Sequence, residues 1–152
     1  MSVDIVYNAT RQTRERIGII KLTTKSEYSI LGLIYIARQK EAIFVKIEDI
    51  CSKHDIPKKY LEQLFLILKQ NRYLKTRRGS AGGYTLAKPP SQISIAEIIR
   101  LMDGALAPTE SVSKYFHSDT PLSGEKKITK VFKEIRDYIS NRLENLKLSD
   151  LV

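Results

Sequence analysis

The sequence feature that most constrains the fold is a pair of short helical patterns followed at once by a hairpin pattern, within residues 47–88. In the first pattern Ile47, Ile50 and Cys51 fall on one face of a helix, and residues 53–57 interrupt it. Pro57 suits the first turn of a new helix, where an amide proton has no intrahelical partner. The next apolar residues recur at helical spacing: Leu61, Leu64, Phe65 and Leu68. Two helices joined by a tight turn predict a helix-turn-helix.

A hairpin pattern follows directly. Residues 73–78 have a strand-like composition, three glycines lie between Gly79 and Gly83, and residues 84–87 resume a strand before Pro89. A hairpin at this place predicts a winged helix-turn-helix, in a fold that is mainly α with a small β-hairpin wing. In that arrangement the second helix occupies a major groove of DNA, and the wing carries cations to the adjacent backbone or minor groove.

Further helices are expected on both sides of this unit. A capping box from Thr24 to Glu27 predicts a helix that runs to about Gln39, and Ser94 begins another that ends near Gly104. Residues 105–124 show no clear periodicity and predict a long loop. The expected organisation is an N-terminal extension (1–20), a winged helix-turn-helix domain (21–90), a connecting helix (91–104), a loop (105–124), and a dimerisation helix with its tail (125–152).

The last helix carries an apolar stripe longer than one small domain usually buries. We therefore expect it to pair with the same helix of a second chain. The residues predicted to form this homodimer contact are Ile128, Phe132, Ile135, Ile139, Leu143 and Leu146.

The positive charge is concentrated in one part of the chain. The formal net charge is +9, and residues 57–88 hold eight Lys and Arg against a single Glu. Such an excess favours a polyanionic partner, although a merely solvated face is the alternative.

The sequence shows no membrane-spanning apolar run and no secretion signal, so a cytoplasmic protein without a membrane partner is expected. Cys51 is the single cysteine and excludes an intrachain disulfide; neither a metal site nor an enzyme's nucleophile–base pair is recognisable.

Several strings resemble the Rrf-two family of winged-helix transcriptional regulators, which includes members of the IscR, NsrR and CymR types. They are Lys21-Leu-Thr-Thr-Lys-Ser-Glu-Tyr28, Ile56-Pro-Lys-Lys-Tyr-Leu-Glu-Gln-Leu64, Arg78-Gly-Ser-Ala-Gly-Gly-Tyr84 and Ile95-Ala-Glu-Ile-Ile-Arg100. The resemblance covers roughly residues 21–150 and implies a sequence-specific regulator. In such a protein a homodimer binds double-stranded DNA at a pseudo-palindromic operator.

The resemblance also implies which residues contact DNA. Lys59 and Glu62 match positions that touch base edges, where a carboxylate can accept from a cytosine amino group, and Arg78 matches the wing residue of the minor groove. The alternative is that Glu62 is a capping or intrahelical partner of Lys58 or Lys59. The remaining expected contacts, which equally suit surface or packing roles, are Lys25, Lys58, Tyr60, Gln63 and Arg77.

The chain departs from the family pattern in the loop. Sensing members carry three cysteines there that hold an iron–sulfur cluster. This chain has Ser111, Ser118 and Ser123 in a similar segment, and serine hydroxyls are poor iron ligands. Two explanations stay open: the serines replace natural cysteines of a cluster-binding protein, or the chain is naturally cluster-free. No cofactor is expected for the chain as written. An alternative function is a cluster-free regulator that acts through a protein partner, as in CymR-type repressors.

Overall fold

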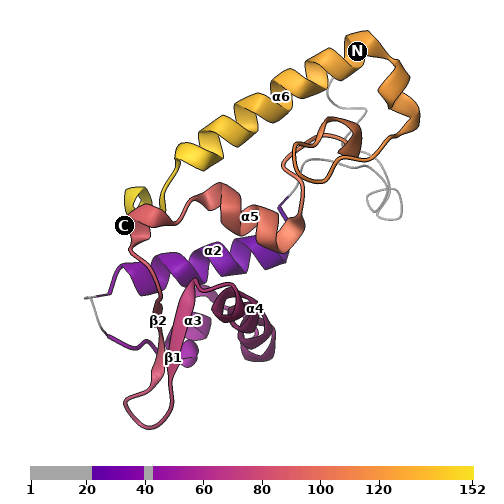
Figure 1. Cartoon of the computed structure of the whole chain (residues 1–152). Coiled ribbons are helices and arrows are strands. Elements are labelled where there is room, and N and C mark those ends of the chain that lie inside the picture. Colours follow the sequence, from indigo (N-terminus) through magenta and orange to yellow (C-terminus); the bar gives the residue numbers. More distant parts are fainter. Residues whose placement is uncertain (1–21, 40–42) are drawn as a thin grey trace, which may run out of the picture.

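A computed structural model of the chain describes residues 22–39 and 43–152, so the predicted N-terminal extension lies outside the described residues. Five α-helices, one β-hairpin and four short 3₁₀ turns are described (Figure 1). In chain order they are α2 (Thr24–Ala37), α3 (Ile47–His54), α4 (Lys58–Gln70), β1 (Leu74–Arg77), β2 (Gly83–Leu86), η1 (Pro90–Gln92), α5 (Ile95–Asp103), η2 (Glu110–Val112), η3 (Pro121–Gly124), α6 (Lys126–Asn145) and η4 (Leu148–Leu151). The prediction of a mainly α fold with a small hairpin is confirmed.

The turn between α3 and α4 forms where the sequence predicts it. Asp55 adopts a left-handed conformation with φ 52° and ends α3, and Pro57 stands immediately before the first residue of α4. A left-handed residue is a common way to end a helix, and the fixed φ of proline suits the start of the next. Local residue chemistry therefore turns the chain from one helix into the other.

The wing consists of β1, β2 and the turn between them. The two strands are antiparallel, with Leu74 opposite Leu86, and Val45 before α3 bridges to Tyr84. A Cβ on Gly83 would lie 2.3 Å from the carbonyl oxygen of Val45, and one on Gly82 would lie 2.2 Å from that of Arg77. Both distances are far below any tolerated contact, so the wing turn requires glycine at position 82, and the pairing of Val45 with β2 requires glycine at position 83.

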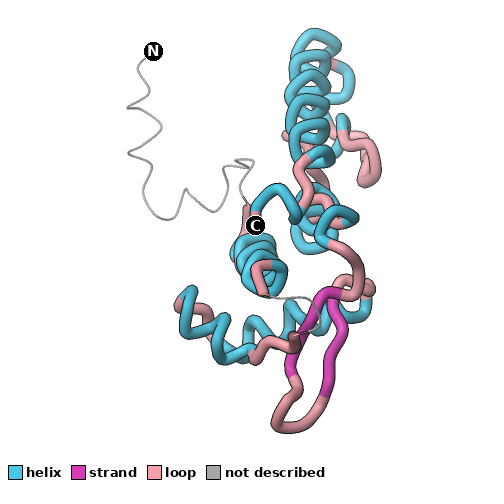
Figure 2. Tube along the Cα trace, turned by 90° about the vertical axis from the view of Figure 1, so that its left-hand side faces the viewer, coloured by secondary structure: helices cyan, strands magenta, loops and turns pink. Residues whose placement is uncertain are grey.

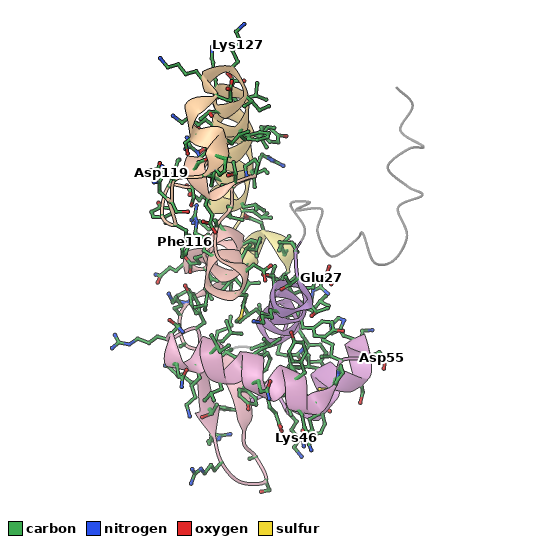
Figure 3. The ribbon with its side chains drawn as sticks, turned by 90° about the vertical axis from the view of Figure 1, so that its right-hand side faces the viewer. Glu27, Lys46, Asp55, Phe116, Asp119 and Lys127 are labelled. Carbon is green, nitrogen blue, oxygen red and sulfur yellow. The ribbon has the colours of Figure 1, made fainter. Side chains whose placement is uncertain are left out.

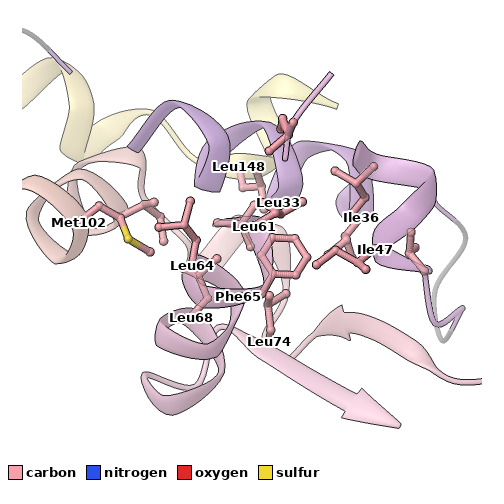
Figure 4. Close-up of a cluster of buried hydrophobic side chains, with 14 of the residues drawn as sticks. Leu33, Ile36, Ile47, Leu61, Leu64, Phe65, Leu68, Leu74, Met102 and Leu148 are labelled. Carbon is pink, nitrogen blue, oxygen red and sulfur yellow. The ribbon is translucent and has the colours of Figure 1, made fainter. Parts of the chain in front are cut away.

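One core holds the helix-turn-helix and the wing together (Figure 4). Phe65 and Leu61 of α4 are fully buried, and Leu33 of α2 packs in the same cluster. The ring of Phe65 lies 4.9 Å from that of Tyr84, measured between centroids, so the wing is fixed directly to α4. Each such side chain contributes about 1.5–3 kcal/mol when it is buried.

The start of α2 differs by one residue from the sequence prediction. Thr23, not Thr24, is the N-cap, and its hydroxyl accepts from the amide of Lys25. The reason is a contact from α5: the Asp103 carboxylate accepts from the amide and hydroxyl of Thr23 and, at 2.8 Å, from the hydroxyl of Ser26. The predicted capping box was therefore wrong, because a carboxylate 80 residues away fixes this helix end.

The long helix α6 and the wing lie at opposite ends of the molecule (Figure 2). The C-terminal half of α6 packs on α5 in a second small core, which contains Ile95, Ala96, Ile99 and Leu106. The rest of α6 extends away from the helix-turn-helix beside the loop that follows α5 (Figure 1). None of the described helices is both long enough and apolar enough to span a bilayer.

Candidate nucleic-acid interface

Three segments meet on one face of the protein at the wing end. A surface hollow between the beginning of α3 and the wing turn is lined by Lys46, Glu48, Gly79 and Gly82, among others. Lys58, the first residue of α4, contacts Glu48 of α3 with 2.6 Å between Nζ and Oε1. We call the exposed surface formed by the wing turn and the first turns of α3, α4 and α2 the basic face.

The beginning of α4 presents polar side chains on this surface. Lys59, Glu62 and Gln63 are all exposed, as predicted from the inward position of the apolar stripe. Lys59 forms no ion pair within the described residues, so its ammonium group is free to meet an external anion. Glu62 lies 3.8 Å from Lys58 Nζ, which is the intrahelical ion pair that the sequence left open.

The two arginines of the wing have different surroundings. Arg77 donates from Nη2 to the carbonyl oxygen of Ala81 at 2.7 Å, and its guanidinium lies 4.2 Å from the ring centroid of Phe44. Arg78 is exposed and has neither a hydrogen bond nor an ion pair within the described residues. Arg77 therefore braces the wing turn, while Arg78 has its donors available for another molecule.

The start of α2 lies beside the start of α4. Tyr60 shares a hydrogen bond of 3.3 Å with the hydroxyl of Thr24, and its ring meets that of Tyr28 edge to face. Lys25 is exposed on the same first turn of α2. Tyr60 is only partly exposed and packs on the core.

Not every cation of residues 57–88 is free. Lys88 lies 4.3 Å from the ring centroid of Tyr73 and 4.0 Å from the Glu97 carboxylate of α5. Burial, together with nearby Glu97, raises the pKa of Tyr73 to about 12. This cluster fixes the base of the wing to α5 and takes Lys88 out of the basic face.

Cys51 lies behind the basic face on α3. It is partly buried against the core, in agreement with its predicted place on the apolar side of the helix. Burial raises the pKa of its thiol, and the carboxylates of Glu48 and Glu62 act in the same direction. A thiol that resists ionisation is a weak nucleophile and a weak metal ligand.

The structure divides the predicted dimerisation residues into two groups. Ile139, Leu143 and Leu146 pack against α5 of the same chain, and Leu146 lies just beyond the end of α6. Ile128 and Ile135 are each 38% exposed, and Phe132 is half-buried. Val131, which belongs to the apolar stripe of the sequence, and Tyr138, which the sequence prediction missed, extend the exposed group at 45% and 70%. The steps of three, four and three residues from 128 to 138 carried that signal.

The three serines of the loop do not form a metal-binding constellation. Ser111 is buried and its hydroxyl lies 3.2 Å from that of Thr109; Ser118 donates to the Glu110 carboxylate. The hydroxyl of Ser123 accepts from the amide of Thr120 at 2.9 Å. No group of three His, Cys, Asp or Glu side chains suited to a metal ion occurs among the described residues. Hydroxyls with their own local partners do not fit an iron–sulfur cluster, which needs thiolates.

Protein side chains hold this loop against α5 and α6. Arg136 of α6 donates from Nη1 to the carbonyl oxygen of Val112 at 2.7 Å and from Nε to Asp137 at 2.9 Å. Arg100 of α5 pairs with Glu144 at 2.5 Å, and its guanidinium lies 4.8 Å from the ring centroid of Tyr115. Contacts with both neighbouring helices thus hold the loop in place.

Comparisons with known proteins agree with this architecture. Residues 22–152 match the family model Rrf2, described as an iron-dependent transcriptional regulator. The HTH-type transcriptional regulator IscR of Escherichia coli is 31% identical over 134 residues, which are 88% of this chain and 80% of IscR. Among solved structures, CymR, the global cysteine regulator of B. subtilis, aligns with a TM-score of 0.71 at 27% identity over 88% of this chain and 96% of CymR. IscR of T. potens aligns with a TM-score of 0.67 at 25% identity over 86% and 85% of the two chains.

These relatives are regulators of transcription and not enzymes. The matched residues include every described helix and both strands, so the similarity extends to the whole described architecture rather than to the helix-turn-helix alone. The resemblance found in the sequence is confirmed: this chain belongs to the Rrf2 family of winged-helix transcriptional regulators.

Proposed function

We propose that this chain is a sequence-specific DNA-binding regulator that works as a homodimer on a pseudo-palindromic operator. Each protomer inserts the beginning of α4 into a major groove and lays the wing on the adjacent backbone and minor groove. The observation that carries the proposal is the pair of free, exposed cations Lys59 and Arg78 on two segments of one face. Neither cation forms an ion pair within the described residues, so both can bind an external anion.

The remaining residues of the basic face have distinct roles in this proposal. Lys59 and Glu62 read base edges, with Gln63 beside them, because a helix presents its first turns to the floor of the groove. Arg78 enters the minor groove. Lys25, Tyr60 and Arg77 contact phosphates and set the register of the protein on the duplex.

The dimer forms through the exposed group on α6. Ile128, Val131, Ile135 and Tyr138 recur at the spacing of a helix-to-helix seam, are exposed, and belong to neither hydrophobic core of the described residues. A second copy of α6 is the natural cover for such a stripe, since a two-fold interface uses the same surface on both chains. The two basic faces then bind successive major grooves about 34–36 Å apart.

Salt dependence tests the DNA-binding proposal. We expect the affinity for duplex DNA to fall with a slope of log K against log salt of about −3.6 or steeper, because at least two cations from each protomer replace counterions. Fluorescence anisotropy of a labelled duplex, recorded at salt concentrations from about 50 to 300 mM, measures this slope. A slope near zero would favour the alternative function, docking to a protein partner.

The chain as written is proposed to work without an iron–sulfur cluster. After anaerobic incubation with ferrous iron and sulfide we expect no visible charge-transfer absorption, because the loop offers no thiolate. The matched comparison is the triple variant Ser111→Cys, Ser118→Cys, Ser123→Cys. Absorption in that variant alone supports replacement of natural cysteines, whereas absorption in the parent chain contradicts the proposal.

A further inference from the structure

An acidic residue lies on the basic face beside a lysine of the recognition helix. Glu48 stands in the first turn of α3, and its Oε1 lies 2.6 Å from Nζ of Lys58. Glu62 approaches the same Nζ to 3.8 Å. These three side chains together carry a net charge of −1, and Lys46 is a further cation near Glu48.

We propose that Glu48 competes with DNA phosphates for Lys58 and thereby lowers the affinity of the basic face for duplexes that offer no matching base contacts. This inference rests on the proposed function. In the free protein Lys58 is neutralised by Glu48, so on binding it displaces fewer of the cations that are condensed on the DNA. A phosphate can bind Lys58 only after the Glu48 contact opens, which leaves a carboxylate facing the polyanion.

Because the pair is exposed, Lys58 can exchange Glu48 for an external phosphate and can also return to Glu48. Glu48 and Lys58 side chains are 55% and 50% exposed, so water screens the pair and an external phosphate can reach it. The hydrogen bond from Lys58 holds the pKa of Glu48 below its usual value, and the same contact raises the pKa of Lys58. Both groups are therefore charged at neutral pH, and the competition does not depend on titration of either one.

The effect is selective because phosphates and bases are read by different groups. Lys59, Glu62 and Arg78 can reach an operator whether or not Lys58 holds a phosphate. A random duplex supplies phosphate contacts alone, so the loss of one such contact per protomer is a larger share of its binding. Glu48 is thus a positioning residue. It determines whether Lys58 is paired within the protein or available to a phosphate, and it need not touch DNA itself.

The substitution Glu48→Gln tests this inference. On a random-sequence duplex we expect the salt slope to steepen by about 0.9 for each bound protomer, which is about eightfold tighter binding per protomer at 0.1 M salt. The matched control is Asp49→Asn on the same turn, since Asp49 is exposed and forms no ion pair within the described residues. Its salt slope should equal that of the parent chain.

A second variant separates competition for Lys58 from a general change of charge. In a Lys58→Gln background, Glu48→Gln should tighten binding no more than the matched control Asp49→Asn does, and circular dichroism should show that all variants are folded. A larger gain that persists without Lys58, or an unchanged slope for Glu48→Gln while the parent binds DNA, would overturn this inference alone. If the parent chain binds no duplex at any salt concentration, the proposed function fails with it.

Discussion

Replacement of Ile135 by Glu is expected to convert the protein into a monomer and to weaken binding to an operator by at least about a hundredfold. Ile135 is 38% exposed in the middle of the apolar group of α6, so in the proposed dimer a new carboxylate meets its two-fold copy in an apolar interface. An unpaired charge there costs several kcal/mol. Loss of the dimer also removes the gain from linked half-sites, which is worth about 10²–10⁴ in affinity.

Light scattering coupled to gel filtration measures the first part of this result. The parent chain should show about twice the mass of one 17.4 kDa chain, and the variant the mass of one. Lys133→Glu is the matched control, because it places the same side chain on an exposed position of the same helix outside the apolar group. A variant that stays dimeric would locate the dimer contact elsewhere.

Replacement of Arg78 by Ala is expected to weaken duplex binding about eightfold per protomer, and hence roughly 60-fold for a dimer at 0.1 M salt. Arg78 has no partner within the described residues that the substitution could disturb, so the fold should be unaffected. The salt slope should become shallower by about 1.8, since two cations no longer displace counterions.

Lys127→Ala is the control for Arg78→Ala. It removes one positive charge at the start of α6, at the opposite end of the molecule from the wing (Figure 3). Titration of the same labelled duplex should give the parent affinity for this variant. Equal losses for both variants would mean that net charge alone governs binding and that the wing has no particular role.

The helix-turn-helix and the wing could be predicted from sequence because the signals for them are local. Pro57 marks the beginning of α4, and Gly82 stands where a Cβ would meet the carbonyl oxygen of Arg77. The apolar spacing around Phe65 fixes which face of α4 is buried and so leaves Lys59 on the exposed face. Each of these depends on residues within a few positions of one another.

What the sequence could not provide depends on contacts between distant residues. The cap of α2 is shared with Asp103, and Lys58 is neutralised by Glu48 from the preceding helix. The apolar stripe of α6 gave no sign that Leu143 packs on α5 of its own chain while Ile135 stays exposed. Periodicity shows which residues share a face of a helix, but not which part of that face another element of the chain covers.

The most direct test of the central claim is selection of duplexes from a random pool by the intact protein, followed by sequencing of those retained. Two copies of α4 related by a two-fold axis should enrich an inverted repeat, with half-site centres about one helical turn apart. Two results would contradict a dimer that reads two grooves. One is that duplexes are retained only at low salt and no sequence is enriched; the other is that the enriched duplexes contain a single asymmetric half-site.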